Sequence, residues 1–272
     1  VDLRAMPDSV NQWVSDRSVT ALVVLKDGKI AHEDYFMGTS PEDLRISWSV
    51  AKSFLSALMG IVIADGDIAS IDDPVTKYAT DLVGSAYEGA TIRNVLNMAS
   101  GVTFNEDYLD FNSDINKMGR VLAMGGSMDK FAANLNNRDR DAGAVWQYVS
   151  IDTHIIGMVI PGATGRDIPA LMVEKLLTPP GLEADPIMLT DGVGVAFVLG
   201  GLNLRTCDYA RLGQMFLQGG MYNGQQIVPA DWVVQSTVPS APTPDGGTRY
   251  GFQWWMPADA EHGEYFARGI YG

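Results

Sequence analysis

Alternating apolar and polar positions predict strands at both ends of the chain. Ser9–Arg17 is predicted to be a helix, and the β-rich stretch Thr20–Leu25 follows it. A Lys-Asp-Gly-Lys turn and a second alternating stretch, Ile30–Phe36, complete the pattern of a β-hairpin. Strand character returns only near the end of the chain, in Tyr250–Trp255 and Tyr265–Tyr271.

A helical pattern fills the region between these strands. Ser49–Asp65 is apolar, with small residues and few charges, which predicts a buried helix. Asn105–Asn116 is rich in Asn and Asp, which favour turns, and is predicted to be a loop. Further helices are predicted at Thr91–Met98, Asp152–Gly162, Pro169–Leu177, Thr206–Gln218 and Pro229–Ser236.

Strands that bracket a helical middle indicate an α/β (α+β) fold. We expect an antiparallel sheet formed from both chain ends and flanked by helices, with an inserted, mainly helical region. Residues 1–45 and 246–272 would form the sheet region, and residues 46–245 the helical region. The chain has no internal repeat or long linker that would suggest another division.

Composition narrows the possible partners. The 272 residues include 46% hydrophobic and 19% charged residues, as in a globular protein, and carry a formal net charge of −14. So acidic a chain is a poor candidate for binding nucleic acid or anionic lipid, because phosphate contacts need Lys and Arg. The apolar run Phe54–Ala64 is too short to cross a bilayer, so we expect no membrane insertion.

Metal and cofactor chemistry finds little support in the sequence. Cys207 is the only cysteine, so neither an internal disulfide nor a cysteine-based metal site is possible. His32, His154 and His262 are far apart in the sequence, and no His-Glu-x-x-His pattern occurs. We therefore predict no metal and no cofactor.

One candidate for chemistry is a serine followed three positions later by a lysine. Ser49 and Lys52 would share one face of the predicted helix, where burial would lower the lysine pKa and supply a neutral amine as a base. Ser127 and Lys130 match the same spacing, so the motif alone is weak. Ser127 follows two glycines and precedes polar sequence, whereas Ser49 opens an apolar helix. The alternative for Ser49 is a plain helix N-cap.

Two further elements could complete such a site. Trp146-Gln-Tyr-Val-Ser150 could supply a phenol from Tyr148 and a hydroxyl from Ser150, although it also fits an aromatic strand leading into a capped helix. Ala267-Arg-Gly-Ile-Tyr-Gly272 reads as a glycine-rich edge strand. Gly269 would let a substrate backbone approach closely, and the next N–H could point at an oxyanion.

In this order, the elements resemble the serine β-lactamase and penicillin-binding-protein superfamily. Four segments are most similar in sequence to 6-aminohexanoate-dimer hydrolases and β-lactamase-like (family VIII) carboxylesterases. They are Ser47–Phe54, Trp146–Ser150, Leu204–Gly213 and Ala267–Gly272. The similarity extends from the first hairpin to the last residue. It implies the β-lactamase-like fold and a serine hydrolase without cofactor.

The resemblance also implies a role for each residue. Ser49 would form an acyl-enzyme, and Lys52 would keep Tyr148 partly ionised so that the phenol relays a proton to the leaving group. Ser150 would orient Lys52. The oxyanion would lie between the backbone N–H groups of Ser49 and Ile270.

Tyr108 is the candidate for a substrate-contacting tyrosine, because these hydrolases carry such a residue on the loop after their second helix. An ordinary exposed loop tyrosine is the alternative.

The third element departs from the superfamily pattern. Ala267 stands where β-lactamases and penicillin-binding proteins carry a Lys that helps hold a substrate carboxylate. Arg268 is adjacent, but neighbouring side chains on a strand point to opposite faces, so we expect Arg268 to face away. Ala267, and Ser150 in place of Asn, favour ester or amide substrates over β-lactams. The chain also begins at Val1 and stops at Gly272 within this element, as expected of part of a longer protein.

Three functions fit these residues. The leading one is a carboxylesterase or a 6-aminohexanoate-oligomer-type amidase that acts on a small-molecule ester or amide. The second is a sensor that binds β-lactams or peptides and is acylated slowly, or a weak β-lactamase. The third is a non-catalytic relative that serves as a scaffold. An α/β-hydrolase is disfavoured because no Gly-x-Ser-x-Gly elbow occurs. A soluble protein is expected, and the sequence leaves open a cytoplasmic or periplasmic location and the oligomeric state.

Overall fold

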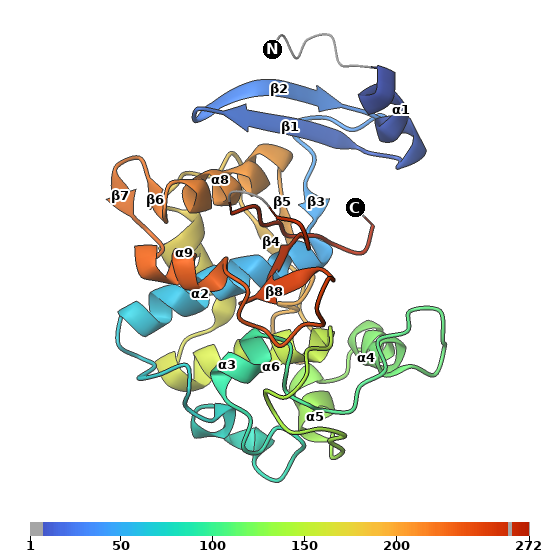
Figure 1. Ribbon diagram of the computed structural model, residues 1–272, viewed down its shortest axis with the longest axis vertical. Helices are drawn as coiled ribbons and strands as arrows, with labels where there is room; N and C mark the ends of the chain where they lie inside the picture. The colour runs from blue at the N-terminus through green and yellow to red at the C-terminus, as the bar shows by residue number, and fades with distance from the viewer. Residues whose placement is uncertain (1–7, 261–262, 272) are drawn as a thin grey trace.

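A computed structural model of the protein describes residues 8–260 and 263–271. Helix α1 (Asp8–Asp16) leads into strands β1 (Ala21–Lys26) and β2 (Lys29–Tyr35), which pair antiparallel. Asp27 and Gly28 form the turn, with φ values of 51° and 72°. The predicted helix and hairpin are confirmed, and they lie together at one end of the molecule (Figure 1).

The centre of the molecule is built on two buried helices. Helix α2 (Ala51–Ala64) packs against α6 (Ser150–Thr164). Every residue of α2 from Ala51 to Val62 is buried, as the apolar sequence predicted. A short 3₁₀ turn, η1 (Trp48–Val50), precedes α2, so the first turn of the predicted helix is wound more tightly than the rest.

Shorter helices surround this pair (Figure 1). The 3₁₀ turns η2 (Val75–Lys77) and η3 (Thr80–Leu82) and helices α4 (Asp114–Ala123) and α5 (Met128–Ala133) lie where no helix was predicted. Helices α4 and α5 bury only two residues each, so the sequence gives a weak apolar signal. The predicted helices are confirmed as α3 (Ile92–Leu96), α7 (Ile168–Leu171) with the π-helical η4 (Met172–Leu177), α8 (Thr206–Leu217) and α9 (Ala230–Ser236).

The described strands form four small antiparallel sheets. Besides β1–β2, they are β3 (Arg45–Ile46), β5 (Leu202–Leu204) and β4 (Ile187–Met188) in that order; β6 (Met221–Tyr222) with β7 (Gln225–Gln226); and β8 (Arg249–Gly251) with β9 (Trp254–Met256). The antiparallel α/β class is therefore confirmed. The prediction of one sheet from both chain ends is not, because no hydrogen-bonded ladder among the described strands joins β1–β2 to β8–β9.

The two C-terminal strands also differ from prediction. Tyr250–Trp255 is a tight hairpin instead of one strand, because Gln253 at the turn adopts a left-handed backbone with φ of 66°. Buried Gln253 donates through Nε2 to the carbonyls of Val95 and Leu96 and ties the hairpin to α3. The predicted strand Tyr265–Tyr271 is reduced to one bridge, between Phe266 and Trp255.

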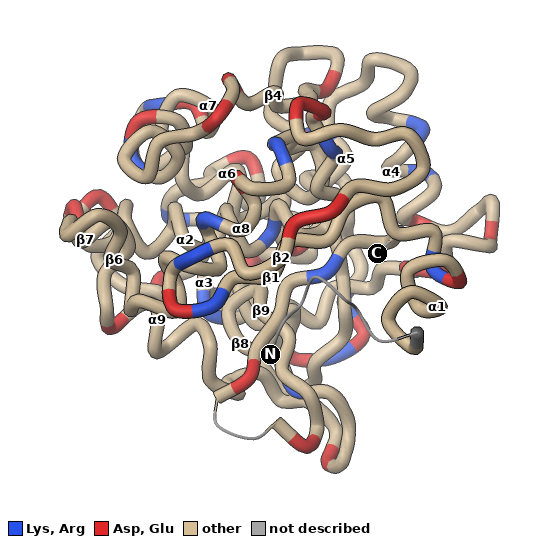
Figure 2. The backbone as a smooth tube through the Cα atoms, turned by 90° about the horizontal axis from the view of Figure 1, so that it is seen from above, with Lys and Arg blue, Asp and Glu red and all other residues tan. Residues whose placement is uncertain are grey.

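The surface charge agrees with the acidic composition. Asp and Glu are spread over the chain, with Lys and Arg between them (Figure 2). Each helix in the described part of the chain is too short or too polar to span a bilayer.

Candidate active site

Ser49 lies in the 3₁₀ turn η1, just before the buried helix α2. Its side chain caps neither element, so the plain N-cap interpretation does not hold for this serine. Trp48, immediately before it, adopts a left-handed backbone with φ of 42°, which is strained for a bulky residue. In contrast, Ser127 is the N-cap of α5, and its hydroxyl accepts a hydrogen bond from the Lys130 N–H at 3.3 Å.

Lys52 lies on α2 and is buried, with only 1% of the residue exposed. Its Nζ donates to the Leu199 carbonyl at 2.9 Å, and no carboxylate of the described residues pairs with it. Burial lowers the pKa of Lys52 to about 7, against the opposing charge of Glu106. A substantial neutral fraction is therefore present near neutral pH, as a general base requires.

Tyr148 lies next to Ser49 and Lys52. Its ring stacks on Trp255 with centroids 5.2 Å apart, and Lys52 Nζ lies 5.7 Å from the centroid of the tyrosine ring. Burial raises the pKa of Tyr148 to about 12, although the nearby Ser49 hydroxyl lowers it in part. The resting phenol is thus protonated at neutral pH, in contrast to the partly ionised tyrosine that the resemblance implied.

Ser150 contacts a residue that the sequence did not single out. Its N–H donates to Glu106 at 2.9 Å and its hydroxyl also donates to Glu106, whereas no hydrogen bond between described atoms joins it to Lys52. Tyr108 donates its hydroxyl to the same carboxylate at 2.8 Å. Glu106 therefore binds two of the predicted site residues, Ser150 and Tyr108. Its negative charge also raises the pKa of Lys52 and of Tyr148.

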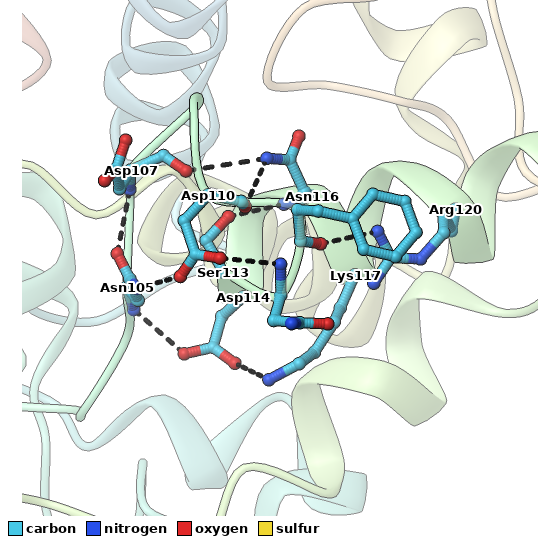
Figure 3. A network of polar contacts seen from close by, with 10 residues as sticks. Asn105, Asp107, Asp110, Ser113, Asp114, Asn116, Lys117 and Arg120 are labelled. Carbon is cyan, nitrogen blue, oxygen red and sulfur yellow. Dashed lines mark hydrogen bonds and ion pairs between the residues drawn. The ribbon is translucent and has the colours of Figure 1, made fainter.

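Only the tertiary structure distinguishes Glu106 from the acidic residues around it. The loop Asn105–Asn116 is held by its own Asn and Asp side chains (Figure 3). Asn105 N–H donates to Asp114 at 2.9 Å, and Asn116 Nδ2 donates to the Asp110 carbonyl at 2.8 Å. These contacts fix the loop that carries Glu106 and Tyr108. The only feature of the sequence that could have pointed to Glu106 was its position two residues before Tyr108.

The C-terminal segment approaches the serine through Gly269. A Cβ at this position would lie 2.9 Å from the Ser47 carbonyl oxygen and 3.0 Å from Trp48 Cβ, so only glycine fits without a shift. Tyr271 meets the edge of Trp48 with ring centroids 5.6 Å apart. Backbone hydrogen bonds of the described residues use neither the Ser49 N–H nor the Ile270 N–H, which leaves both donors for a substrate oxygen. Gly272 lies outside the described residues.

No group of three or more His, Cys, Asp or Glu side chains within the described residues could hold a metal ion. His154 Nε2 pairs with Asp129 at 2.7 Å, and His262 lies outside the described residues. Hollows of about 470, 550 and 210 Å³ occur elsewhere, for example beside Met158 and Gln214, and Ser49 lines none of them.

Comparisons with known proteins point to one family. A family model described as Beta-lactamase matches residues 11–272. A 6-aminohexanoate-dimer hydrolase of Paenarthrobacter ureafaciens is 28% identical over 281 residues, covering 98% of this chain and 71% of that protein.

Solved structures show the same fold. One from Bacillus anthracis, assigned as a 6-aminohexanoate-dimer hydrolase, has a TM-score of 0.82 at 23% identity, covering 97% of this chain and 71% of that one. A D-stereospecific amidohydrolase from a Streptomyces species has a TM-score of 0.66 at 19% identity, with 86% and 76% covered.

Proposed function

Because the chain belongs to the beta-lactamase family, we propose that it is a serine hydrolase that cleaves ester or amide bonds through an acyl-enzyme on Ser49. The observation that carries the proposal is a buried Lys52 whose pKa is near 7, with its Nζ 5.7 Å from the centre of the Tyr148 ring and with Ser49 three residues before it. The proposed nucleophile comes from η1, the proposed base from α2, and the proposed proton donor from the residues just before α6.

The pKa values favour a division of labour in the first step. Neutral Lys52 accepts the Ser49 proton, directly or through the Tyr148 hydroxyl, while Ser49 Oγ forms a bond to the substrate carbonyl carbon. The carbonyl oxygen becomes an oxyanion between the N–H groups of Ser49 and Ile270. Protonated Tyr148 then donates its proton to the leaving oxygen or nitrogen, which departs and leaves the acyl-enzyme, and the Lys52 ammonium returns a proton to the Tyr148 phenolate. Water hydrolyses this ester in the second step and restores Ser49.

Glu106 has a supporting role in this scheme. Its carboxylate accepts hydrogen bonds from Ser150 and Tyr108 and raises the pKa of both Lys52 and Tyr148. We assign Ser150 to this network and not to a direct contact with Lys52. Tyr108 is 43% exposed beside it, which suits a residue that touches substrate at the rim of the site.

The substrate class follows from the family and from the departures in this chain. The relative at 28% identity is named for hydrolysis of the 6-aminohexanoate dimer, which contains an amide bond. Ala267 replaces the lysine of the β-lactam-processing relatives. We therefore propose small esters or amides as substrates, and β-lactams as poor ones.

Turnover of a 4-nitrophenyl ester tests this proposal. The chain should release 4-nitrophenol over many turnovers, and Ser49→Ala should abolish release and labelling by a fluorophosphonate probe. Ser127→Ala is the matched control, because it removes the serine of the second Ser-x-x-Lys spacing and should keep the activity. A single stoichiometric burst without turnover would identify a slowly acylated sensor, and an unlabelled Ser49 in folded protein would refute the mechanism.

A further inference from the structure

The segment from Tyr265 to Arg268 alternates between two faces. Tyr265 and Ala267 pack against the main hydrophobic core, while Phe266 packs in the small aromatic cluster around Trp255. By the same alternation, Arg268 points to the face of Phe266 and contacts Trp255. The prediction that Arg268 and Ala267 face opposite ways is therefore correct. The face of Arg268 is the one on which Trp255 and Tyr148 lie, so its side chain is directed to the site.

Arg268 reaches the catalytic tyrosine through one aromatic ring. Its guanidinium carbon lies 4.1 Å from the centroid of Trp255, within cation–π distance. Trp255 in turn stacks on Tyr148. The positive charge of Arg268 contributes to lowering the pKa of both Tyr148 and Tyr250, although burial dominates at each. A fixed positive charge thus acts on the proton donor of the proposed reaction.

This charge is available for a ligand. Arg268 is exposed, and no carboxylate within the described residues forms an ion pair with it. In a chain with a net charge of −14, carboxylates for such a pair are plentiful. Glu106 also acts on Tyr148, but its carboxylate already accepts three hydrogen bonds. A guanidinium held over a ring presents its N–H donors in a planar fork, which matches a carboxylate.

We propose that Arg268 binds a carboxylate of the substrate, so that the preferred substrates are esters or amides with a carboxylate a few bonds from the scissile carbonyl. This inference rests on the proposed serine hydrolase function. Arg268 reaches the site from the face of this segment opposite Ala267, so it does not take the place of the lysine that position 267 lacks. An exposed arginine stacked on a tryptophan for packing alone is the competing explanation.

A pair of matched substrates separates the two explanations. Mono-4-nitrophenyl adipate carries a free carboxylate, and its methyl ester is the neutral counterpart. We expect the wild-type protein to have the higher kcat/KM for the anionic ester. Arg268→Gln should lower the ratio of the two kcat/KM values about tenfold, mainly through KM, as expected for the loss of one charge-assisted hydrogen bond. Arg268→Lys should restore part of the ratio.

Arg166→Gln is the control for a general change in charge, because Arg166 lies on the surface, paired with Glu174, and should leave the ratio unchanged. Equal loss on both esters in Arg268→Gln would overturn the inference and assign Arg268 to packing, as would a wild-type ratio near one. Failure of the proposed function looks different: neither ester would turn over and Ser49→Ala would change nothing, which would also remove the basis of this inference.

Discussion

Burial of Lys52 should make the protein less stable near neutral pH than it is in alkali. The folded-state pKa is about 7, against an ordinary value of 10.5 in the unfolded chain. Between these two values the unfolded state binds more protons, so this group contributes stability that rises with pH. Below pH 7 both states are protonated, and the full penalty of holding the buried charge applies.

The size of this penalty follows from the two pKa values. At about 1.4 kcal/mol for each unit, the difference between 10.5 and about 7 amounts to about 5 kcal/mol, of which about 4 kcal/mol remains at pH 7. Lys52→Met removes the charge but leaves the Leu199 carbonyl without its donor, which costs about 1–3 kcal/mol. The variant should be inactive and yet more stable by about 2 kcal/mol at pH 7, with a Tm higher by roughly 4–8 °C.

Denaturant unfolding at pH 7, 8.5 and 10 tests the reasoning. The gain from Lys52→Met should fall by about 3 kcal/mol between pH 7 and pH 10, because the wild-type lysine loses its charge over this range. Other groups titrate alike in both proteins and cancel in the difference. Lys130→Met, at the exposed lysine of the second motif, should show a constant difference. A constant difference for Lys52→Met as well would refute a lowered lysine pKa.

Three further predictions concern catalysis. The value of kcat/KM should fall as the pH drops below about 7, because Lys52 becomes protonated. Glu106→Gln should move this decrease to lower pH, since the Glu106 charge raises the pKa of Lys52. An unchanged profile would exclude this coupling. Tyr148→Phe should lower kcat by about 10²–10⁴-fold while circular dichroism stays unchanged, because the proton donor is lost. Gly269→Val should lower kcat/KM by up to about 100-fold, because its side chain would displace the Ser47–Ser49 backbone; full activity in a folded variant would show that this contact does not set the oxyanion geometry.

The elements that the sequence predicted are those with a strong local signal. The first hairpin has a turn that needs Gly28, and α2 is apolar along nearly its whole length, so both could be assigned from residues close together in the chain. Helices α4 and α5 have mostly polar surfaces and were missed. The single sheet expected from both chain ends is not formed among the described strands, because strand pairing depends on which distant strands meet. The division into 1–45 with 246–272 and 46–245 stays a prediction.

The sequence by itself singled out the residues proposed for the site, in order: Ser49, Lys52, Tyr148 and Gly269. Spacing on a helix and the order of motifs along the chain are local properties, and they suffice for these residues. The sequence could not determine the charge states of these residues or the side chains that contact them, because both depend on burial and on groups far away in the chain. Only the tertiary structure lowered the pKa of Lys52 to about 7, paired Ser150 with Glu106, and placed Arg268 over the ring on which Tyr148 stacks.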